Sequence, residues 1–209
     1  ARDVKPLRYE TSGFHPWTRE EVTQFEARHQ IGTKARLALA LMLYLGVRRG
    51  DLVTLGRQHV RDGVIRFVPL KTRRKKMHAI EIPIVAELAA IIEASPTGDL
   101  TFLTTEWGKP FTANGFGGWF RDRCDEAGLP HCSAHGLRKA GATIAAERGA
   151  TDRQLMAMFG WESSRQATTY TASADRKRLA AEAARLIAGD RKANIDCPTE
   201  LPHRIKAKG

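Results

Sequence analysis

The sequence has few cysteines, no zinc-type cysteine spacing and fewer acidic than basic residues. Its three cysteines, among 209 residues, form no C-x-x-C pair. An odd, widely spaced set argues against a disulfide framework and is typical of a protein from a reducing cytoplasm. Cys124 and Cys132 stand near His131 and His135, but this spacing matches no zinc-site pattern, so the sequence predicts no metal.

Long hydrophobic runs are also absent. The longest apolar run, Leu37–Val47, has 11 residues and is closed by Arg36 and Arg48. A membrane-spanning helix needs roughly 20 such residues, so we interpret the run as a buried helix and predict no membrane partner. Residues 1–6 contain Arg2, Asp3, Lys5 and Pro6 and lack the apolar core of a signal peptide, which favours a cytoplasmic location.

The shortage of acidic residues leaves the chain strongly basic. There are 34 Lys and Arg against 23 Asp and Glu, giving a formal net charge of +11 and a pI near 10.0. Such an excess favours a polyanionic partner, with nucleic acid first and an anionic membrane second. A hydrophobic content of 42% excludes a wholly disordered basic tail, and the length fits one domain.

The pattern of apolar and capping residues predicts a mainly helical chain. Thr18 and Glu21 form a capping box at the first helix, and Thr33 opens an apolar helix that ends near Gly46. Apolar periodicity and capping signals predict further helices over residues 85–92, 116–124, 136–148, 152–159 and 176–188.

A small antiparallel sheet is predicted between the helices. Val64–Val68 and Ala79–Ile82 are short and rich in β-branched residues, and Leu100–Leu103 is a third strand candidate. Residues 71–76 hold five cations in six positions where a hairpin tip is expected. We therefore predict one domain over residues 17–188, after a lead-in of residues 1–16 and before a polar tail of residues 189–209.

Four groups of residues have side chains suited to chemistry. His135 and Arg138 are three residues apart and share a helix face. Arg48 stands where the apolar helix ends, Lys71 begins the basic tip, and Tyr170 follows Trp161 by nine positions. Taken alone, each has a structural explanation: a surface pair, a cation at a helix C-terminus, a solvated turn and a packed ring.

In combination, these residues resemble the tyrosine recombinase (phage integrase) family. The first box of the family is similar to residues 46–52, and its second is similar to residues 135–139 followed by Ala142-Thr143. The third box is similar to residues 159–161 leading to Tyr170. The order and spacing of the boxes together carry the resemblance, which covers residues 17–188.

Three positions depart from the family pattern. Trp161 stands where most members have His, Asp51 replaces the usual Glu, and Lys139 follows Arg138 where His is common. None of these changes removes a group that the chemistry requires, since some members carry the same Trp and the carboxylate is kept. The resemblance therefore implies an active enzyme with the family's DNA breaking–rejoining fold.

The residue types also fit attack on a phosphodiester. Arginine offers paired donors that match phosphate and stay charged, so Arg48 and Arg138 are expected to clamp the scissile phosphate. By resemblance, Tyr170 is the nucleophile that forms a 3′-phosphotyrosyl link, with His135 accepting its proton, and Lys71 is the general acid. The Trp161 indole can donate to a phosphate oxygen. Rejoining conserves the bond energy, which implies no cofactor.

The basic residues outside this set are predicted to contact the DNA backbone of a double-stranded partner. These are Arg73, Arg74, Lys75, Lys76 and Lys139.

The resemblance also implies a homo-tetramer on DNA, with residues 176–188 docking on a neighbouring subunit. It implies a phage or mobile element acting on the bacterial nucleoid. The family's N-terminal DNA-clamping domain is not contained in these 209 residues, and residues 1–16 are expected to be the connector to it.

Two alternatives remain open on the sequence alone. A type IB topoisomerase uses similar Arg, Lys, His and Tyr chemistry but relaxes supercoils without a partner site. A non-catalytic regulator could keep the fold and bind DNA. Retention of every expected catalytic group argues against the regulator.

Overall fold

The computed structural model describes residues 13–71 and 79–188. The predicted DNA contacts Arg73, Arg74, Lys75 and Lys76, together with most of the lead-in and the whole tail, lie outside the described residues. The chain divides into two compact units, one ending at Asp175 and the other beginning at Arg176, and each is described by itself. The division into lead-in, domain and tail stays a prediction.

The first two helices begin where the sequence predicts, and the second also ends there. In α1 (Arg19–Arg28), the Thr18 hydroxyl accepts from the Glu21 N–H and the Glu21 carboxylate accepts from the Thr18 N–H, which completes the capping box. Thr33 caps α2 (Lys34–Leu45), which ends at Gly46 in the left-handed conformation, with φ of 56°. Eight of the twelve α2 side chains are buried, so this helix forms the centre of the core.

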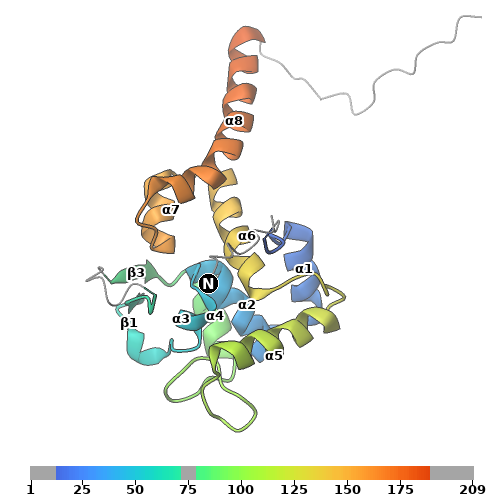
Figure 1. The fold of residues 1–209 in the computed structure, drawn as a ribbon, viewed down its shortest axis with the longest axis vertical. Helices are drawn as coiled ribbons and strands as arrows, with labels where there is room; N and C mark the ends of the chain where they lie inside the picture. Colours follow the sequence, from blue (N-terminus) through green and yellow to red (C-terminus); the bar gives the residue numbers. More distant parts are fainter. Residues whose placement is uncertain (1–12, 72–78, 189–209) are drawn as a thin grey trace, which may run out of the picture. The chain divides into compact units, whose positions relative to one another are not determined.

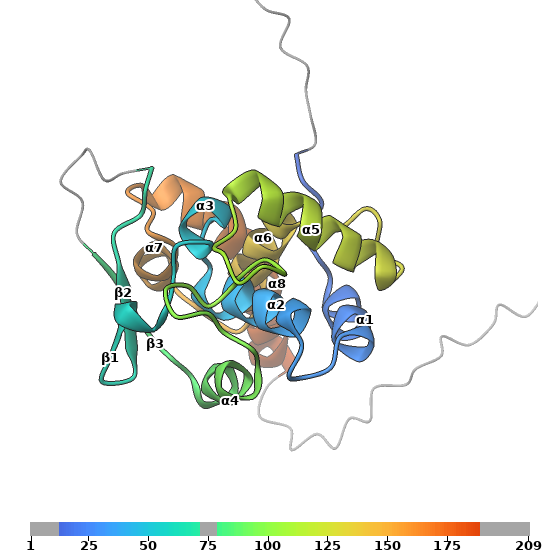
Figure 2. The same cartoon turned by 90° about the horizontal axis from the view of Figure 1, so that it is seen from below.

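Helix α2 contacts α3 (Arg49–Leu52), α4 (Ala86–Ala94), α5 (Ala113–Glu126) and α6 (Ala134–Glu147) (Figures 1 and 2). A buried aromatic row formed by Trp17, Phe25, Phe120 and Phe116 fills the space between α1 and α5. The described chain also contains α7 (Asp152–Phe159) and α8 (Ser164–Ala188), and a 3₁₀ turn at Arg57–His59.

The sheet has three antiparallel strands in the order β1 (Val60–Arg61), β2 (Val64–Phe67) and β3 (Ile80–Pro83). It lies at one edge of the first unit, beside α7 (Figures 1 and 2). Ile65 pairs with Ile82 and both are buried, which fixes the register, because a shift by one residue would turn them to solvent. The mainly helical fold with a small antiparallel sheet is confirmed.

One predicted strand is wrong. Leu100–Leu103 is a loop, and the third strand is β1. Phe102 and Leu103 are buried, and the Phe102 N–H donates to the Leu55 carbonyl oxygen at 2.8 Å. A short apolar run that is buried in a loop has the same sequence pattern as a strand, although no ladder forms there.

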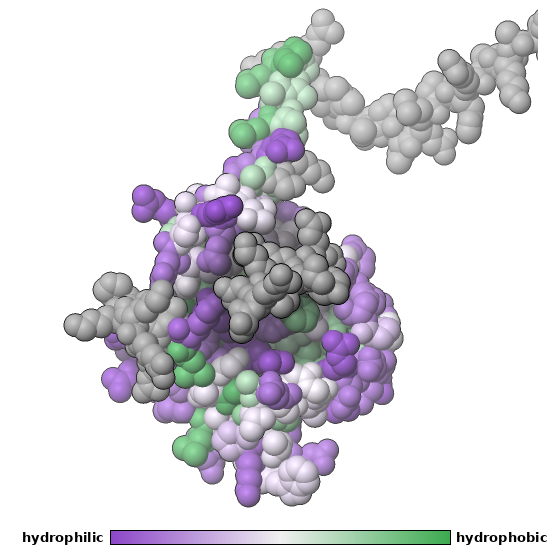
Figure 3. Space-filling view, viewed as in Figure 1, coloured by the Kyte–Doolittle hydropathy of each residue, from purple (hydrophilic) through white to green (hydrophobic). Residues whose placement is uncertain are grey.

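The last helix is longer than predicted. α8 begins at Ser164, so Tyr170 lies within a helix instead of in a segment before it. In the second unit, residues 176–188 are helical, and Leu179, Leu186 and Ile187 are 57%, 83% and 87% exposed. Exposed apolar side chains colour this end of the helix green in Figure 3. No helix within residues 13–71 and 79–188 has the length and apolar character to cross a membrane.

Candidate active site

Residues from three separate segments meet around one pocket of about 240 Å³. Four of the six predicted catalytic residues line it: His135 and Arg138 from α6, Trp161 after α7, and Tyr170 from α8. Lys139, Gln166 and Thr169 complete the lining. Arg48 and Lys71, which also belong to the described residues, are not among the lining residues. The sequence missed Gln166 and Thr169. Gln166 stands four positions before Tyr170, a spacing that places both on one helix face and would have indicated Gln166 if a helix had been expected there.

Two backbone carbonyls fix the guanidinium of Arg138. One nitrogen donates to the Gly46 carbonyl oxygen and another donates to the Phe159 carbonyl oxygen at 2.5 Å. Both acceptors stand at helix C-termini, where carbonyls lack partners within the helix. Gly46 allows this approach, because a Cβ there would lie 2.6 Å from the Phe159 ring. Arg138 is therefore held in place before any ligand arrives.

Two arginines, Arg138 in the pocket and Arg48 nearby, are accompanied by one carboxylate, that of Asp51. Burial and the nearby charge of Arg48 lower the pKa of Arg138 to about 10, and Asp51 opposes the shift. Arg138 still carries its full charge at neutral pH. Arg48 is partly buried at the start of α3. Two neighbouring positive charges repel each other less when an anion lies between them. This electrostatic pattern is that of an oxyanion site.

Tyr170 is oriented by an aromatic stack. Its ring lies 5.4 Å from that of Trp161 at an interplanar angle of 10°, and Trp161 stacks in turn on Phe159 at 4.9 Å. Trp161 is 9% exposed, so the stack is part of the core. Burial raises the pKa of Tyr170, and the charge of Arg138 opposes this. The phenol is therefore protonated at neutral pH and needs a proton acceptor in order to attack.

Asp152 ties the helix that carries Tyr170 to α7. Its carboxylate accepts from the hydroxyls of Thr168 at 2.8 Å and Thr171 at 2.5 Å, on either side of Tyr170. These hydrogen bonds, that of Thr171 first, lower the pKa of Asp152. The sequence analysis did not identify this residue, because a first-turn Asp is already explained by the helix dipole.

His135 and Lys139 contact the lead-in segment. The His135 ring lies 4.5 Å from the ring of Phe14, and the Lys139 ammonium donates to the Phe14 carbonyl oxygen at 2.7 Å. Burial, followed by the charges of Arg49 and Arg138, lowers the pKa of His135. A neutral imidazole beside a protonated phenol is suited to accept its proton. The prediction that Lys139 contacts DNA stays a prediction.

Lys71 stands at the base of the hairpin, which is anchored to the first box. The buried Asp51 carboxylate accepts from the Leu70 N–H at 2.8 Å, one residue before Lys71. A Cβ on Gly160, the residue before Trp161, would overlap the Ile80 side chain, so β3 packs closely against this turn. Asp51 therefore positions the hairpin base, while the Lys71 side chain is exposed.

A family model described as "Phage integrase family" matches residues 18–177 of the chain. An integrase of Mycobacterium phage L5 is 30% identical over 71% of this chain and 46% of the relative. An integrase of Mycobacterium phage FRAT1 is 27% identical over 65% of this chain and 47% of the relative. The chain thus spans about half the length of the curated relatives it matches. The family indicated by the sequence is confirmed.

Solved structures agree in fold. XerA recombinase matches with a TM-score of 0.67 at 19% identity, over 85% of this chain and 67% of that one. The Tn1549 transposon integrase in complex with transposon right end DNA gives 0.66 at 18% identity, over 83% and 69%. A lambda integrase dimer bound to a COC′ core site gives 0.63 at 18% identity, over 78% and 61%. These similarities show that the fold is that of tyrosine recombinases.

Proposed function

Because the chain belongs to the phage integrase family, we propose that it cleaves and rejoins DNA strands at a defined site through Tyr170. The observation that carries the proposal is the shared pocket of His135, Arg138, Trp161 and Tyr170, which come from three separate segments. A partly buried phenol beside a fixed guanidinium and a neutral imidazole has the groups needed for attack on a phosphate.

In the proposed step, the Tyr170 oxygen attacks the phosphorus and the bond to the 5′ oxygen breaks. His135 accepts the phenolic proton, and Lys71 gives a proton to the departing 5′ oxygen. Arg48 and Arg138 stabilise the charge that gathers on the non-bridging oxygens, and the Trp161 N–H donates to one of them. The reverse reaction, with a 5′ hydroxyl from another strand, rejoins the DNA and releases the phenol.

The fold neighbours supply the proposed partner. The lambda and Tn1549 enzymes were solved with DNA, and we extend double-stranded DNA to this chain. The exposed apolar side chains Leu179, Leu186 and Ile187 fit the docking of residues 176–188 on a neighbouring subunit of a tetramer. The site of action would be the nucleoid of a bacterial host, and Lys139 with the hairpin cations would contact phosphates.

A library of DNA duplexes tests the proposal without a defined target sequence. The 209-residue chain is incubated with short duplexes that carry a randomised core and a nick, so that cleavage releases a small fragment and traps the covalent complex. Selection of detergent-resistant adducts, followed by sequencing, should recover a defined core. Tyr170→Phe should abolish the adduct. Tyr44→Phe, in α2, is the matched control and should form it as the parent does.

Absence of an adduct from the whole library, or an adduct that survives Tyr170→Phe, would overturn the proposal. Adducts without any common core, together with relaxation of any supercoiled plasmid, would instead indicate a topoisomerase. The role of Lys71 has its own test: Lys71→Ala should slow cleavage of the selected duplex, and a 5′-thio leaving group, which needs no proton, should restore it. Failure of that rescue would remove Lys71 from the acid role.

A further inference from the structure

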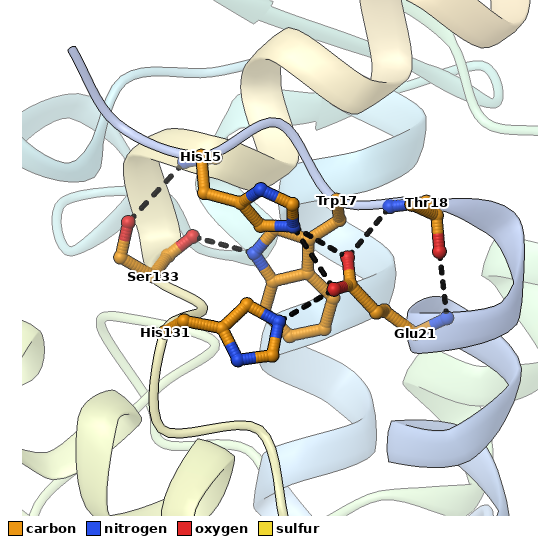
Figure 4. Close-up of polar contacts among 7 residues, drawn as sticks. His15, Trp17, Thr18, Glu21, His131 and Ser133 are labelled. Atoms are coloured by element: carbon orange, nitrogen blue, oxygen red, sulfur yellow. Dashed lines mark hydrogen bonds and ion pairs between the residues drawn. The ribbon is translucent and has the colours of Figure 1, made fainter. Parts of the chain in front are cut away.

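A second cluster of chemically versatile side chains surrounds Glu21, outside the pocket (Figure 4). The Nε2 atom of His15 lies 2.8 and 2.9 Å from the two carboxylate oxygens, and the Nε2 atom of His131 lies 2.6 Å from one of them. Both imidazole rings point at the carboxylate in Figure 4. Together with the buried Cys132, these residues place four donor atoms within 4.8 Å of one another.

We propose that His15, Glu21, His131 and Cys132 bind a zinc ion. Two imidazoles, a thiolate and a carboxylate are all zinc ligands, and four of them close a tetrahedral structural site. Zinc bonds of about 2.0–2.3 Å place such donors about 3.3–3.8 Å apart. The observed donors reach this spacing by side-chain movements of about 1 Å. Binding releases the Cys132 proton and leaves both Nε2 atoms without a proton.

Contacts that do not involve the donor atoms already hold the three ligand-bearing segments together. The Trp17 indole donates to the Ser133 carbonyl oxygen at 2.9 Å, which joins the residue just after the lead-in to the loop before α6. A Cβ on Gly136 would overlap the His15 carbonyl oxygen, so the lead-in runs directly against α6. A scaffold of this kind lowers the entropic cost of binding a metal, because the ligands need little ordering.

The carboxylate has a partner that would remain after binding. One Glu21 oxygen accepts from the Thr18 N–H at 2.7 Å within the capping box. With that oxygen held by the backbone, the other is oriented toward His131, where the ion would lie. Such outer hydrogen bonds orient metal ligands in known sites. The site would join the lead-in to the loop that precedes His135.

The test uses the 209-residue chain in a Cys197→Ser background, freed of metal with a chelator. Zinc chloride should bind with one equivalent per chain, measured by native mass spectrometry. Cobalt(II) should give the visible bands of tetrahedral coordination and a near-ultraviolet thiolate-to-cobalt band. Cys132→Ser should remove the thiolate band and weaken binding by at least about tenfold. Cys124→Ser, which is equally buried, should change neither.

His131→Gln is the second variant, because its exposed side chain can be replaced without loss of the fold, and it should weaken zinc binding by a similar factor. Circular dichroism checks that each variant is folded. Failure of the parent to bind either metal, or binding that both variants leave unchanged, would overturn the proposal and leave a hydrogen-bonded cluster only. Because the readout is metal binding, the result is independent of DNA cleavage.

Discussion

Two histidine-bearing clusters near the start of α6 differ in how their charges are balanced. In the pocket, burial and neighbouring arginines lower the pKa of His135, and burial and Arg48 lower that of Arg138. Around Glu21, burial raises the pKa of the carboxyl, but hydrogen bonds from His131, Thr18 and His15 outweigh this and bring the pKa to about 2. One cluster has cations in need of an anion, and the other has a carboxylate satisfied by its own neighbours.

Under the proposed functions, the pocket is a site for a substrate and the Glu21 cluster is a structural site. Uncompensated charge costs stability and is stabilised only when the ligand arrives, as in preorganised catalytic sites. In the Glu21 cluster, the imidazole N–H groups of His15 and His131 contact the carboxylate directly, where a metal ion would otherwise lie between them. The first cluster should therefore respond to phosphate, and the second to metal.

The largest effect is expected from replacing Arg138, in the pocket whose positive charges lack an anion. Arg138→Lys keeps the charge but cannot reach two carbonyls and a phosphate together, so cleavage of the selected duplex should fall by about 10²-fold or more. Single-turnover adduct formation measures this. Arg153→Lys, which is exposed on α7, is the control, and an equal loss there would show that the effect is not local.

A smaller effect is expected from removing the carboxylate charge of Glu21, in the cluster whose charges are balanced. Glu21→Gln removes the charge that His15 and His131 contact, and the free energy of unfolding should fall by about 1–3 kcal/mol. Urea denaturation with a chelator present measures the metal-free protein. Glu20→Gln, at the adjacent exposed position, should change it little, and equal losses in both variants would remove the special role of Glu21.

A several-fold effect is expected from loosening the turn of α8 that carries Tyr170. Asp152→Ala removes the acceptor of Thr168 and Thr171, which frees the turn of α8 that carries Tyr170. Adduct formation should slow by about fivefold, while the affinity for the duplex stays unchanged, since no phosphate contact is lost. Glu162→Ala is the control. A loss of affinity without a change in rate would contradict this positioning role.

The smallest effect concerns pH. The pKa of His135 is lowered from its ordinary value, so the imidazole is neutral at pH 7 and becomes protonated only as the pH falls below about 6.5. The rate of adduct formation should decline along that acidic limb, and His135→Gln should flatten it. A limb that persists in this variant would assign the titration to another group.

The sequence predicted the parts of the fold that depend on local signals. The capping box at Thr18 and the C-cap at Gly46 are short-range, and the structure has both. The prediction of a strand at Leu100–Leu103 was wrong, because a buried loop and a buried strand can have the same apolar residues. The family motifs predicted the pocket residues, since their order is characteristic even when each is weak.

The sequence could not predict contacts between distant segments. Asp152 meets Thr168 and Thr171 only because α8 begins at Ser164. Its place in the first turn of α7, where the helix dipole favours an acid, already explained it. His15 and His131 meet at Glu21 although 110 positions separate Glu21 from His131. The sequence showed Cys132 near Cys124, His131 and His135 in a spacing that matched no zinc-site pattern. The structure groups Cys132 and His131 instead with His15 and Glu21.

The two hydrogen bonds that anchor Arg138 affect the order in which a related protein would lose residues of this pocket during evolution. Since Arg138 closes the ends of two helices, its loss would damage the fold as well as the chemistry. Tyr170 is only partly buried and can become Phe while keeping its stack on Trp161. A related protein that is no longer under selection for activity should therefore lose the tyrosine hydroxyl before it loses the arginine. In such relatives, a conserved arginine alone would indicate the fold, and a conserved tyrosine would indicate activity.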